Sequence, residues 1–233
     1  MNKRIRTDPH CFVSIVGPCG SGKTQLVSKM LANQNQVFKP SFDKILYLYN
    51  HYQQSFDDLL VNCLSAKNTI EFRQGLDWSA FEQCEAQKLR TLLVIDDLYQ
   101  QASEDDYFLN LVIAGRHRNI HLMTLKHNLF QQSKHSKTIE LNVTQMILFK
   151  SPRDQEQIGV LGRQMGDRQL LIEAYKRATQ EPFGHLLVDF DPHTDPKLKF
   201  ASNCSGSEPS KIFLASAKMT ETITNEPTRT LYS

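Results

Sequence analysis

The sequence predicts an α/β fold in which a central, mostly parallel β-sheet is flanked by helices. Short apolar runs alternate with amphipathic stretches along most of the 233 residues, the pattern of repeated strand–helix–strand units. One apolar run leads into a glycine-rich turn and then into residues with helical spacing, and another ends in two aspartates. These three observations set the fold class and mark the two places where chemistry is expected.

Seven apolar runs are expected to form strands, at residues 11–17, 44–50, 69–74, 91–97, 121–126, 144–150 and 185–190. The amphipathic stretches are expected to form helices, at residues 23–34, 54–65, 79–89, 104–115, 153–165 and 168–179. Prolines fall between these elements, where a missing backbone N–H group does little harm. A chain of this length can form one large domain or two small ones, and no internal repeat is visible.

Three segments are expected along the chain. Residues 1–10 form a basic N-terminal extension, residues 11–203 form the α/β domain, and residues 204–233 form a largely disordered tail. The tail is rich in Ser, Thr, Glu, Lys and Pro and contains one brief apolar island. A short docking strand at Ile212–Ala215 is the alternative interpretation of that island.

Composition and charge are ordinary for a soluble protein, with 40% hydrophobic residues, 22% charged residues and a formal net charge of +2. No signal-peptide pattern follows the basic N-terminus, and no apolar run is long enough to span a membrane. We therefore expect a cytoplasmic or nuclear protein without membrane contact. The cysteines are scattered, odd in number and without metal-binding spacing, which predicts free thiols at Cys11, Cys19, Cys63, Cys84 and Cys204.

The glycine-rich turn reads GPCGSGKT and matches the pattern G-x-x-x-x-G-K-[ST]. A strand before it and a helix after it are the context that a phosphate-binding loop requires. Glycines let the backbone approach an anion closely, and N–H groups at the helix start then point at phosphate oxygens. Lys23 is expected to contact the β- and γ-phosphates, and the Thr24 hydroxyl is expected to coordinate Mg²⁺. The candidate nucleotide-binding residues are Gly17, Pro18, Cys19, Gly20, Ser21, Gly22, Lys23 and Thr24.

Paired aspartates follow the apolar run TLLVI. A buried strand that ends in two carboxylates is costly unless a positive group lies there, and in a phosphate-loop protein that group is Mg²⁺. Asp96 is expected to hold the metal opposite Thr24, and Asp97 to orient or deprotonate the attacking water. A solvated Asp-Asp turn is the alternative. Because both motifs occur in one chain, we predict ATP hydrolysis that drives a mechanical or conformational change.

The strand expected at 121–126 is followed by His127 and Asn128. A polar side chain at the tip of a strand beside the metal strand can touch the γ-phosphate or its water. Asn128 is therefore a candidate catalytic amide, and His127 is the second candidate for the same role. A polar cap where the strand leaves the core explains both residues nearly as well.

Arg116 and Arg118 lie just before that strand. Arginine suits a phosphoryl transition state because its planar donors stay charged and match phosphate oxygens. An arginine supplied to a neighbouring subunit can change rates by ~10³–10⁵. DNA-phosphate contacts and a solvated basic turn remain open as alternatives. Residues 107–139 contain no Asp or Glu but five Lys or Arg and four His, a charge pattern that favours contact with nucleic acid over an ordinary solvated face.

Two longer segments carry a resemblance to a known family: GRHRNIHLMTLKHNLFQQSKHSKTIELNVTQMILFKSPRDQEQIGVLGRQM and EAYKRATQEPFGHLLVDFDPHTDPKLKF. They resemble the DNA-packaging ATPases of Maverick/Polinton-type elements and adintoviruses, which belong to the FtsK–HerA superfamily and are related to the poxvirus packaging ATPase. The resemblance covers residues 11–202. Its most specific parts are the GRH, the N-L-F, the L-F-K-x-P-R-D block and the A-T-x-x-P-[FY]-G-x-L-L-x-D run.

The resemblance implies a P-loop NTPase fold of the additional-strand type, similar to RecA and FtsK–HerA proteins. In that fold the strand that follows the one ending in the metal-binding aspartate (here 91–97) lies beside the strand that precedes the glycine loop (here 11–17). The family also implies ATP hydrolysis with Mg²⁺ in a ring, a hexamer, that pumps double-stranded DNA into a preformed capsid. In addition to the loop and the two aspartates, Arg116 matches the arginine that reaches the neighbouring subunit's ATP. Arg153 and Arg163 are further candidates for the subunit interface.

The residues expected to contact the γ-phosphate, at the end of the strand at 121–126, depart from the family pattern. Family members usually end this strand in Gln-Asn, whereas this sequence has His127 and Asn128. Either His127 replaces the amide or Asn128 does its work.

The sequence therefore predicts an ATP-driven translocase of double-stranded DNA that packages a viral or virus-like transposon genome. Its expected partners are DNA, capsid proteins and copies of itself, in the host cytoplasm or nucleus or with the virion. Two alternatives stay open: a cellular translocase or helicase of the same superfamily, and a nucleotide-dependent assembly switch without motor activity.

Overall fold

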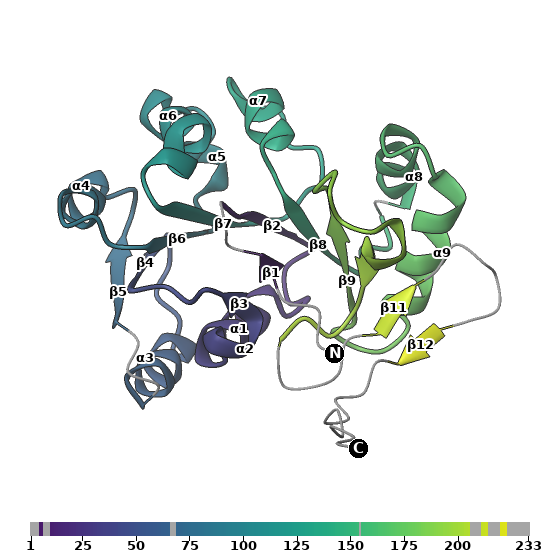
Figure 1. Ribbon diagram of the computed structural model, residues 1–233, viewed down its shortest axis with the longest axis horizontal. Coiled ribbons are helices and arrows are strands. Elements are labelled where there is room, and N and C mark those ends of the chain that lie inside the picture. Colours follow the sequence, from purple (N-terminus) through teal and green to yellow (C-terminus); the bar gives the residue numbers. More distant parts are fainter. Residues whose placement is uncertain are drawn as a thin grey trace, which may run out of the picture.

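The fold is a large central sheet with helices on both faces (Figure 1). It is seen in a computed structural model that describes residues 5–6, 10–65, 69–153, 155–205, 211–213 and 220–222. The strands of the main sheet are β2 (Phe12–Val16), β4 (Lys44–Tyr49), β5 (Thr69–Gln74), β6 (Thr91–Asp96), β7 (Ile120–Lys126), β8 (Gln145–Phe149), β9 (His185–Asp189), β10 (Phe200–Ala201), β11 (Lys211–Phe213) and β12 (Thr220–Thr222). A separate parallel pair joins β1 (Ile5–Arg6) to β3 (Phe38–Lys39).

The helices fill the intervals between the strands. They are α1 (Lys23–Ala32), α2 (Gln34–Val37), α3 (Ser55–Ser65), α4 (Trp78–Ala86), α5 (Tyr99–Ala102), α6 (Asp106–Ala114), α7 (Ser136–Leu141), α8 (Gln155–Gln164) and α9 (Arg168–Ala178), with 3₁₀ turns η1 (Gly115–His117) and η2 (Pro196–Leu198). All seven strands and all six helices expected from the sequence are confirmed to within a few residues at each end. The short helices α2, α5 and α7 were not expected, because four to six residues show too little periodicity.

The strand order is β12-β11-β10-β9-β8-β2-β7-β6-β4-β5. Strand β7 lies between β2 and β6 and is parallel to both, which confirms the expected insertion of the strand after the metal strand beside the glycine-loop strand. The strands from β5 to β8 in this order are parallel, and β9 to β12 continue the sheet antiparallel. The predicted α/β class with a mostly parallel sheet is therefore confirmed.

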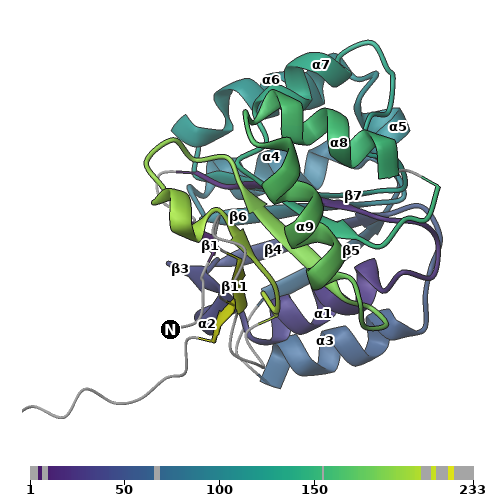
Figure 2. The ribbon, with the colours of Figure 1, turned by 90° about the vertical axis from the view of Figure 1, so that its right-hand side faces the viewer.

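Two apolar layers sandwich the sheet. In β6, Leu93 and Ile95 face the cluster beneath α4 to α9, whereas Leu92 and Val94 face the cluster beneath α1 to α3. Because helices cover both faces, the strand is a continuous apolar run and shows no alternation with polar residues. Figure 2 shows α8 and α9 lying across the β9 side of the molecule, away from α3.

The segment expected as a disordered tail after residue 203 contributes β11 and β12 to the sheet. Ile212 of β11 pairs with Ala201 of β10 and is buried with Phe213. This part differs from the leading expectation and agrees with the alternative of a docking strand near residue 212. The rest of the tail, at 206–210, 214–219 and 223–233, lies outside the described residues, as do residues 1–4 and 7–9 of the basic extension. None of the helices in the described ranges is long and apolar enough to cross a membrane.

Candidate nucleotide-binding site

The glycine loop connects the C-terminal end of β2 to the first residue of α1. Gly20 and Gly22 have positive φ angles of 74° and 97°, a conformation that side chains with a Cβ rarely adopt. A Cβ on Gly17 would lie 2.7 Å from both Cβ of Phe149 and Oγ of Ser21. The sequence therefore needs glycine at these positions for steric reasons. No side chain caps the N-terminus of α1, so its first N–H groups are available to an anion.

Lys23 is folded back onto this loop. Its Nζ donates to the carbonyl oxygens of Gly17 at 2.8 Å and Pro18 at 3.1 Å, and the side chain is almost fully buried. Burial lowers the pKa of Lys23, and the carboxylates of Asp97 and Asp96 oppose that shift. The ammonium group therefore lies inside the loop, where a phosphate would meet it.

Asp96 ends β6 beside Thr24, as the sequence predicted for a metal pair. The Thr24 hydroxyl lies 3.4 Å from Oδ2 of Asp96, and the Tyr47 hydroxyl donates to the same oxygen at 2.7 Å. Asp96 is only 2% exposed, and burial raises its pKa, although the hydrogen bond from Tyr47 acts in the opposite direction. A buried carboxylate with a raised pKa is stabilised by an added cation.

The donor set at this position fits Mg²⁺. A hydroxyl and a carboxylate are the oxygen ligands that magnesium takes from proteins, with phosphate oxygens and water supplying the rest. Within the described ranges, no cluster of three or more His, Cys, Asp or Glu side chains could hold a metal without such additional ligands. Thr24 and Asp96 therefore could hold Mg²⁺ only together with a nucleotide and water.

Asp97 and His127 meet above the loop. Asp97 has a φ of 56°, unusual for a residue with a side chain, and its Oδ1 lies 3.0 Å from Nε2 of His127. On the other side of the imidazole, Nδ1 of His127 lies 3.4 Å from Nζ of Lys23. Because the lysine ammonium can only donate, Nδ1 accepts and Nε2 carries the proton toward Asp97. Asn128, the next residue, is exposed, and the structure records no hydrogen bond from it to Lys23 or the aspartates.

Sequence reasoning missed two buried groups behind the site. Tyr47 comes from the middle of β4, and nothing in its local sequence marks it as a partner of Asp96. Lys126 ends β7, and its side chain is fully buried and donates to the Leu129 carbonyl oxygen at 2.9 Å and to Oε1 of Glu140. The Tyr99 hydroxyl donates to the same carboxylate at 2.8 Å, and the Tyr99 ring lies 5.1 Å from the lysine nitrogen.

Two of the arginine candidates, Arg116 and Arg118, lie far from the glycine loop of their own chain. Arg116 belongs to η1, which precedes β7, and its side chain is outside the described part of the structure. Strand β7 has seven residues, so η1 and the loop are separated by roughly 23 Å at 3.3 Å per residue. Arg118 pairs with Glu85 at 3.2 Å, and Arg153 and Arg163 are exposed. The fold therefore places Arg116 and Arg118 away from the nucleotide-binding site of their own subunit.

The basic stretch at 107–139 is less one-sided than its sequence suggests. Besides the buried Lys126 and the paired Arg118, Lys134 lies 2.8 Å from Asp106 and His135 lies 2.6 Å from the same carboxylate. Neighbouring segments supply the acids that the stretch itself lacks. Much of the predicted positive charge is therefore paired locally, which weakens the case for this stretch as a DNA-binding face.

The comparisons with known proteins agree with this geometry. Residues 2–175 match the family described as the poxvirus A32 protein, which is most of the chain. The chain belongs to the poxvirus A32 protein family. Membership in this family confirms the kinship to the poxvirus packaging ATPase that the sequence predicted. A search of curated proteins found no significant match.

Solved structures support the fold. The genome packaging NTPase B204 from Sulfolobus turreted icosahedral virus 2 in complex with ATP-gammaS is 17% identical, with a TM-score of 0.51 over 80% of this chain and 96% of that chain. The same protein in complex with AMPPCP is 18% identical, with a TM-score of 0.51 over 80% of this chain and 95% of that chain. At this identity the likeness extends to the fold, which this member of the A32 family shares with B204.

Proposed function

We propose that this protein is an ATP-hydrolysing motor that moves double-stranded DNA into a viral or virus-like capsid. The observation that carries the proposal is the convergence of Lys23, Thr24, Asp96 and Asp97 at one edge of the sheet. Membership in the A32 family and the fold shared with a genome packaging NTPase solved with ATP analogues support it. The domain that does this work would span residues 11–203.

In this proposal the loop binds the phosphates of ATP. Backbone N–H groups of residues 17–24 and the start of α1 would donate to phosphate oxygens, and the Lys23 ammonium would turn from the loop carbonyls toward the β- and γ-phosphates. Thr24 and Asp96 would hold Mg²⁺, which when bound neutralises charge on the phosphates. The Tyr47 hydrogen bond keeps the Asp96 carboxylate in place for this role.

In the same proposal, Asp97 and His127 position the attacking water. Asp97 is the general base or the orienting group, and the Nε2–H group of His127 fixes its carboxylate. His127 would then replace the glutamine that family members usually carry, with Lys23 as its second partner. Asn128 stays a second candidate for contact with the γ-phosphate.

We further propose that the motor is a ring, a hexamer, in which Arg116 completes the site of the neighbouring subunit. The separation of η1 from its own loop by the length of β7 supports an action between subunits. Arg118, Arg153 and Arg163 are the other candidates for this interface. Double-stranded DNA and capsid proteins are the proposed partners, in the host cytoplasm or nucleus or with the virion, and the resemblance at 115–165 and 173–200 favours a Maverick/Polinton or adintovirus element.

The first experiment is ATP hydrolysis with and without linear double-stranded DNA, with Lys23→Ala as the inactive control. The motor predicts turnover that DNA stimulates and that Lys23→Ala abolishes. Turnover that ignores DNA would instead favour the nucleotide-dependent switch. Asp97→Asn should keep nucleotide binding and lose turnover, and unchanged turnover in this variant would remove Asp97 from the mechanism.

Mixing two inactive variants tests the ring. In a ring that shares an arginine, a Lys23→Ala subunit can still lend Arg116 to an Arg116→Ala neighbour whose loop is intact. An equal mixture should therefore regain about a quarter of the sites, whereas neither variant hydrolyses ATP alone. A mixture as inactive as its components, with assembled rings confirmed by light scattering, would rule out this sharing.

A further inference from the structure

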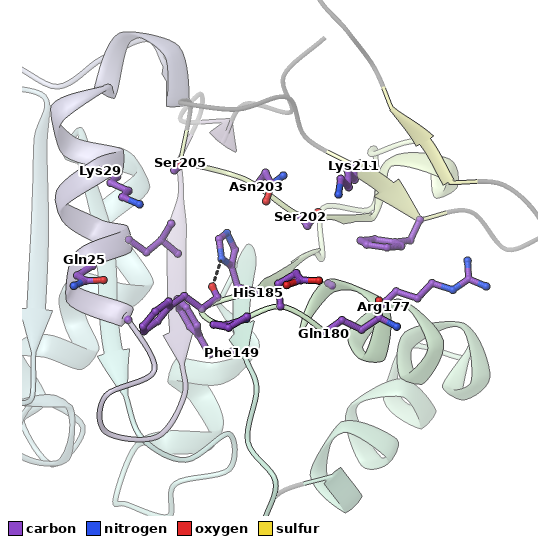
Figure 3. Close-up of a pocket in the computed structure, with 18 residues that line it drawn as sticks. Gln25, Lys29, Phe149, Arg177, Gln180, His185, Ser202, Asn203, Ser205 and Lys211 are labelled. Carbon is purple, nitrogen blue, oxygen red and sulfur yellow. Dashed lines mark hydrogen bonds between the residues drawn. The ribbon is translucent and has the colours of Figure 1, made fainter.

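A cavity of about 720 Å³ opens directly beside the glycine loop, on the flank of α1 that carries Gln25 and Lys29 (Figure 3). Gly22 of the loop forms part of its wall, so the cavity and the phosphate-binding backbone are continuous. The opposite wall comes from the turn between α9 and β9, and from the residues after β10. Its volume lies within the 300–1,000 Å³ range of small-ligand pockets.

Phe183 is the unusual residue of this cavity. It is 63% exposed, although it is a large aromatic side chain, and its φ of 61° is one that residues with a Cβ rarely adopt. Its ring packs against the loop, because a Cβ on Gly22 would lie 3.0 Å from Phe183 Cδ1. An exposed aromatic ring held in a strained backbone conformation beside a binding loop is typical of a ligand contact.

The turn that presents Phe183 is fixed by its neighbours. A Cβ on Gly184 would lie 2.4 Å from the Ala178 carbonyl oxygen, so only glycine fits there. The Gly184 N–H group donates to the Glu181 carbonyl oxygen at 3.0 Å, and the Thr179 hydroxyl donates to the Tyr175 carbonyl oxygen at 2.8 Å. The turn therefore fixes the backbone of Phe183, and its ring lies against the glycine loop.

The floor of the cavity is aromatic and uncharged. Phe149 and His185 lie with ring centroids 5.3 Å apart. Nδ1 of His185 lies 3.3 Å from the Phe183 carbonyl oxygen, and Nε2 lies 3.3 Å from Sγ of Cys204. Burial lowers the pKa of His185, so the imidazole is neutral at neutral pH. An aromatic, uncharged floor suits a heterocyclic base better than a further phosphate.

The edges of the cavity can pair with such a base. The amide side chains of Gln25 and Gln180 each offer a donor and an acceptor. The exposed Lys29 and Arg177 add positive charge at the rim of the cavity. Phosphates on the loop would thus place the rest of the nucleotide in this cavity.

We propose that this cavity holds the base and ribose of the nucleotide, and that the ring of Phe183 stacks on the base. The assignment rests on the proposed nucleotide binding at residues 17–24 and names the part of the ligand that the loop leaves unbound. Aromatic stacking on a base does not depend on base identity, since every base has a π-face. Phe183 therefore adds affinity for nucleotides as a class, while the amides decide between bases.

The test compares ATP with inorganic tripolyphosphate by titration calorimetry on the full-length chain in the presence of Mg²⁺. Tripolyphosphate carries the charge that the loop binds but has no base. Phe183→Ala should weaken ATP binding about tenfold or more and leave tripolyphosphate binding within about twofold, because one stacking contact contributes roughly 1–3 kcal/mol. Phe183→Trp, which keeps an aromatic face, should retain the affinity for ATP.

Phe130→Ala is the matched control, since Phe130 is another exposed phenylalanine that lines a separate cavity beside α7. It should change neither affinity. Unchanged ATP binding in Phe183→Ala would overturn the base assignment, as would an equal loss for ATP and tripolyphosphate. A wild-type chain that binds neither ligand would overturn the proposed function itself and the assignment with it.

Discussion

The buried pair of Lys126 and Glu140 gives the sharpest test of how the site is supported. The lysine side chain is fully buried, and its partners are the Glu140 carboxylate, the Leu129 carbonyl oxygen and the face of Tyr99. Removing one partner of a buried ion pair costs about 3–5 kcal/mol, because the other charge is left without compensation. Since Glu140 is partly exposed and Leu129 still accepts from the lysine, we expect Glu140→Ala to cost about 3 kcal/mol.

Urea unfolding at neutral pH measures this loss. With a slope of about 3 kcal/mol per molar urea, the midpoint should fall by roughly 1 M. The double variant Lys126→Met/Glu140→Ala should recover most of the loss, since it removes the uncompensated charge. Asp106→Ala is the control, because its pair with Lys134 is nearby but exposed, and it should shift the midpoint little.

The pH dependence has a definite sign. Burial lowers the pKa of Lys126 below its usual 10.5, and Glu140 counteracts this shift. Between the folded and unfolded pKa values the unfolded chain binds more protons, so stability rises with pH through that window. The loss of stability caused by burying the charged Lys126 is greatest below the folded-state pKa and disappears toward pH 10.5. In Glu140→Ala the pKa of Lys126 should fall further, so the pH range over which stability rises should extend to lower pH. A urea midpoint that matches wild type at every pH would refute the reasoning.

Three further substitutions test the site. Gly22→Ala should abolish ATP binding in a calorimetric titration, because a residue with a Cβ is strained at a φ of 97° and that Cβ would lie 3.0 Å from the Phe183 ring. Tyr47→Phe should raise the Mg²⁺ concentration for half-maximal ATP hydrolysis about tenfold, since Asp96 loses a hydrogen bond to a charged group. His127→Ala should lower turnover at saturating ATP by ~10²-fold while His127→Gln retains most of it, and equal rates in both variants would remove the side chain from catalysis.

The parts of the site that the sequence predicted are those encoded by consecutive residues. GPCGSGKT fixes its own backbone through glycines, and the run TLLVIDD places Asp96 at a strand end by its apolar length alone. Parallel strands then bring both to the same edge of the sheet, so the neighbourhood of Thr24 and Asp96 follows from topology. Local sequence was sufficient because each motif carries its own geometry.

The parts that the sequence did not predict depend on partners distant in the chain. Burial of Lys126 depends on its ion pair with Glu140, which α7 carries. This helix has six residues, too few to show a helical period in the sequence. The Tyr47 hydroxyl can donate to Asp96 only because β4 pairs with β6. Phe183 was part of a family-like motif, yet its place beside Gly22 requires the α9–β9 turn to fold over the loop. None of these contacts leaves a periodic signal in the sequence.

Strand β7 connects these features into one mechanical element. It begins three residues after η1, which carries Arg116, and the backbone carbonyl oxygen of its last residue, Lys126, accepts a hydrogen bond from the Gly17 N–H group at 3.2 Å. The side chain of Lys126 also holds the Leu129 carbonyl oxygen, which fixes the turn that presents His127. If η1 lies at a subunit interface, one fully buried strand connects that interface to the glycine loop and to the turn of His127. This continuity gives a ring motor of the proposed kind a physical route between one subunit's arginine and its own hydrolysis site.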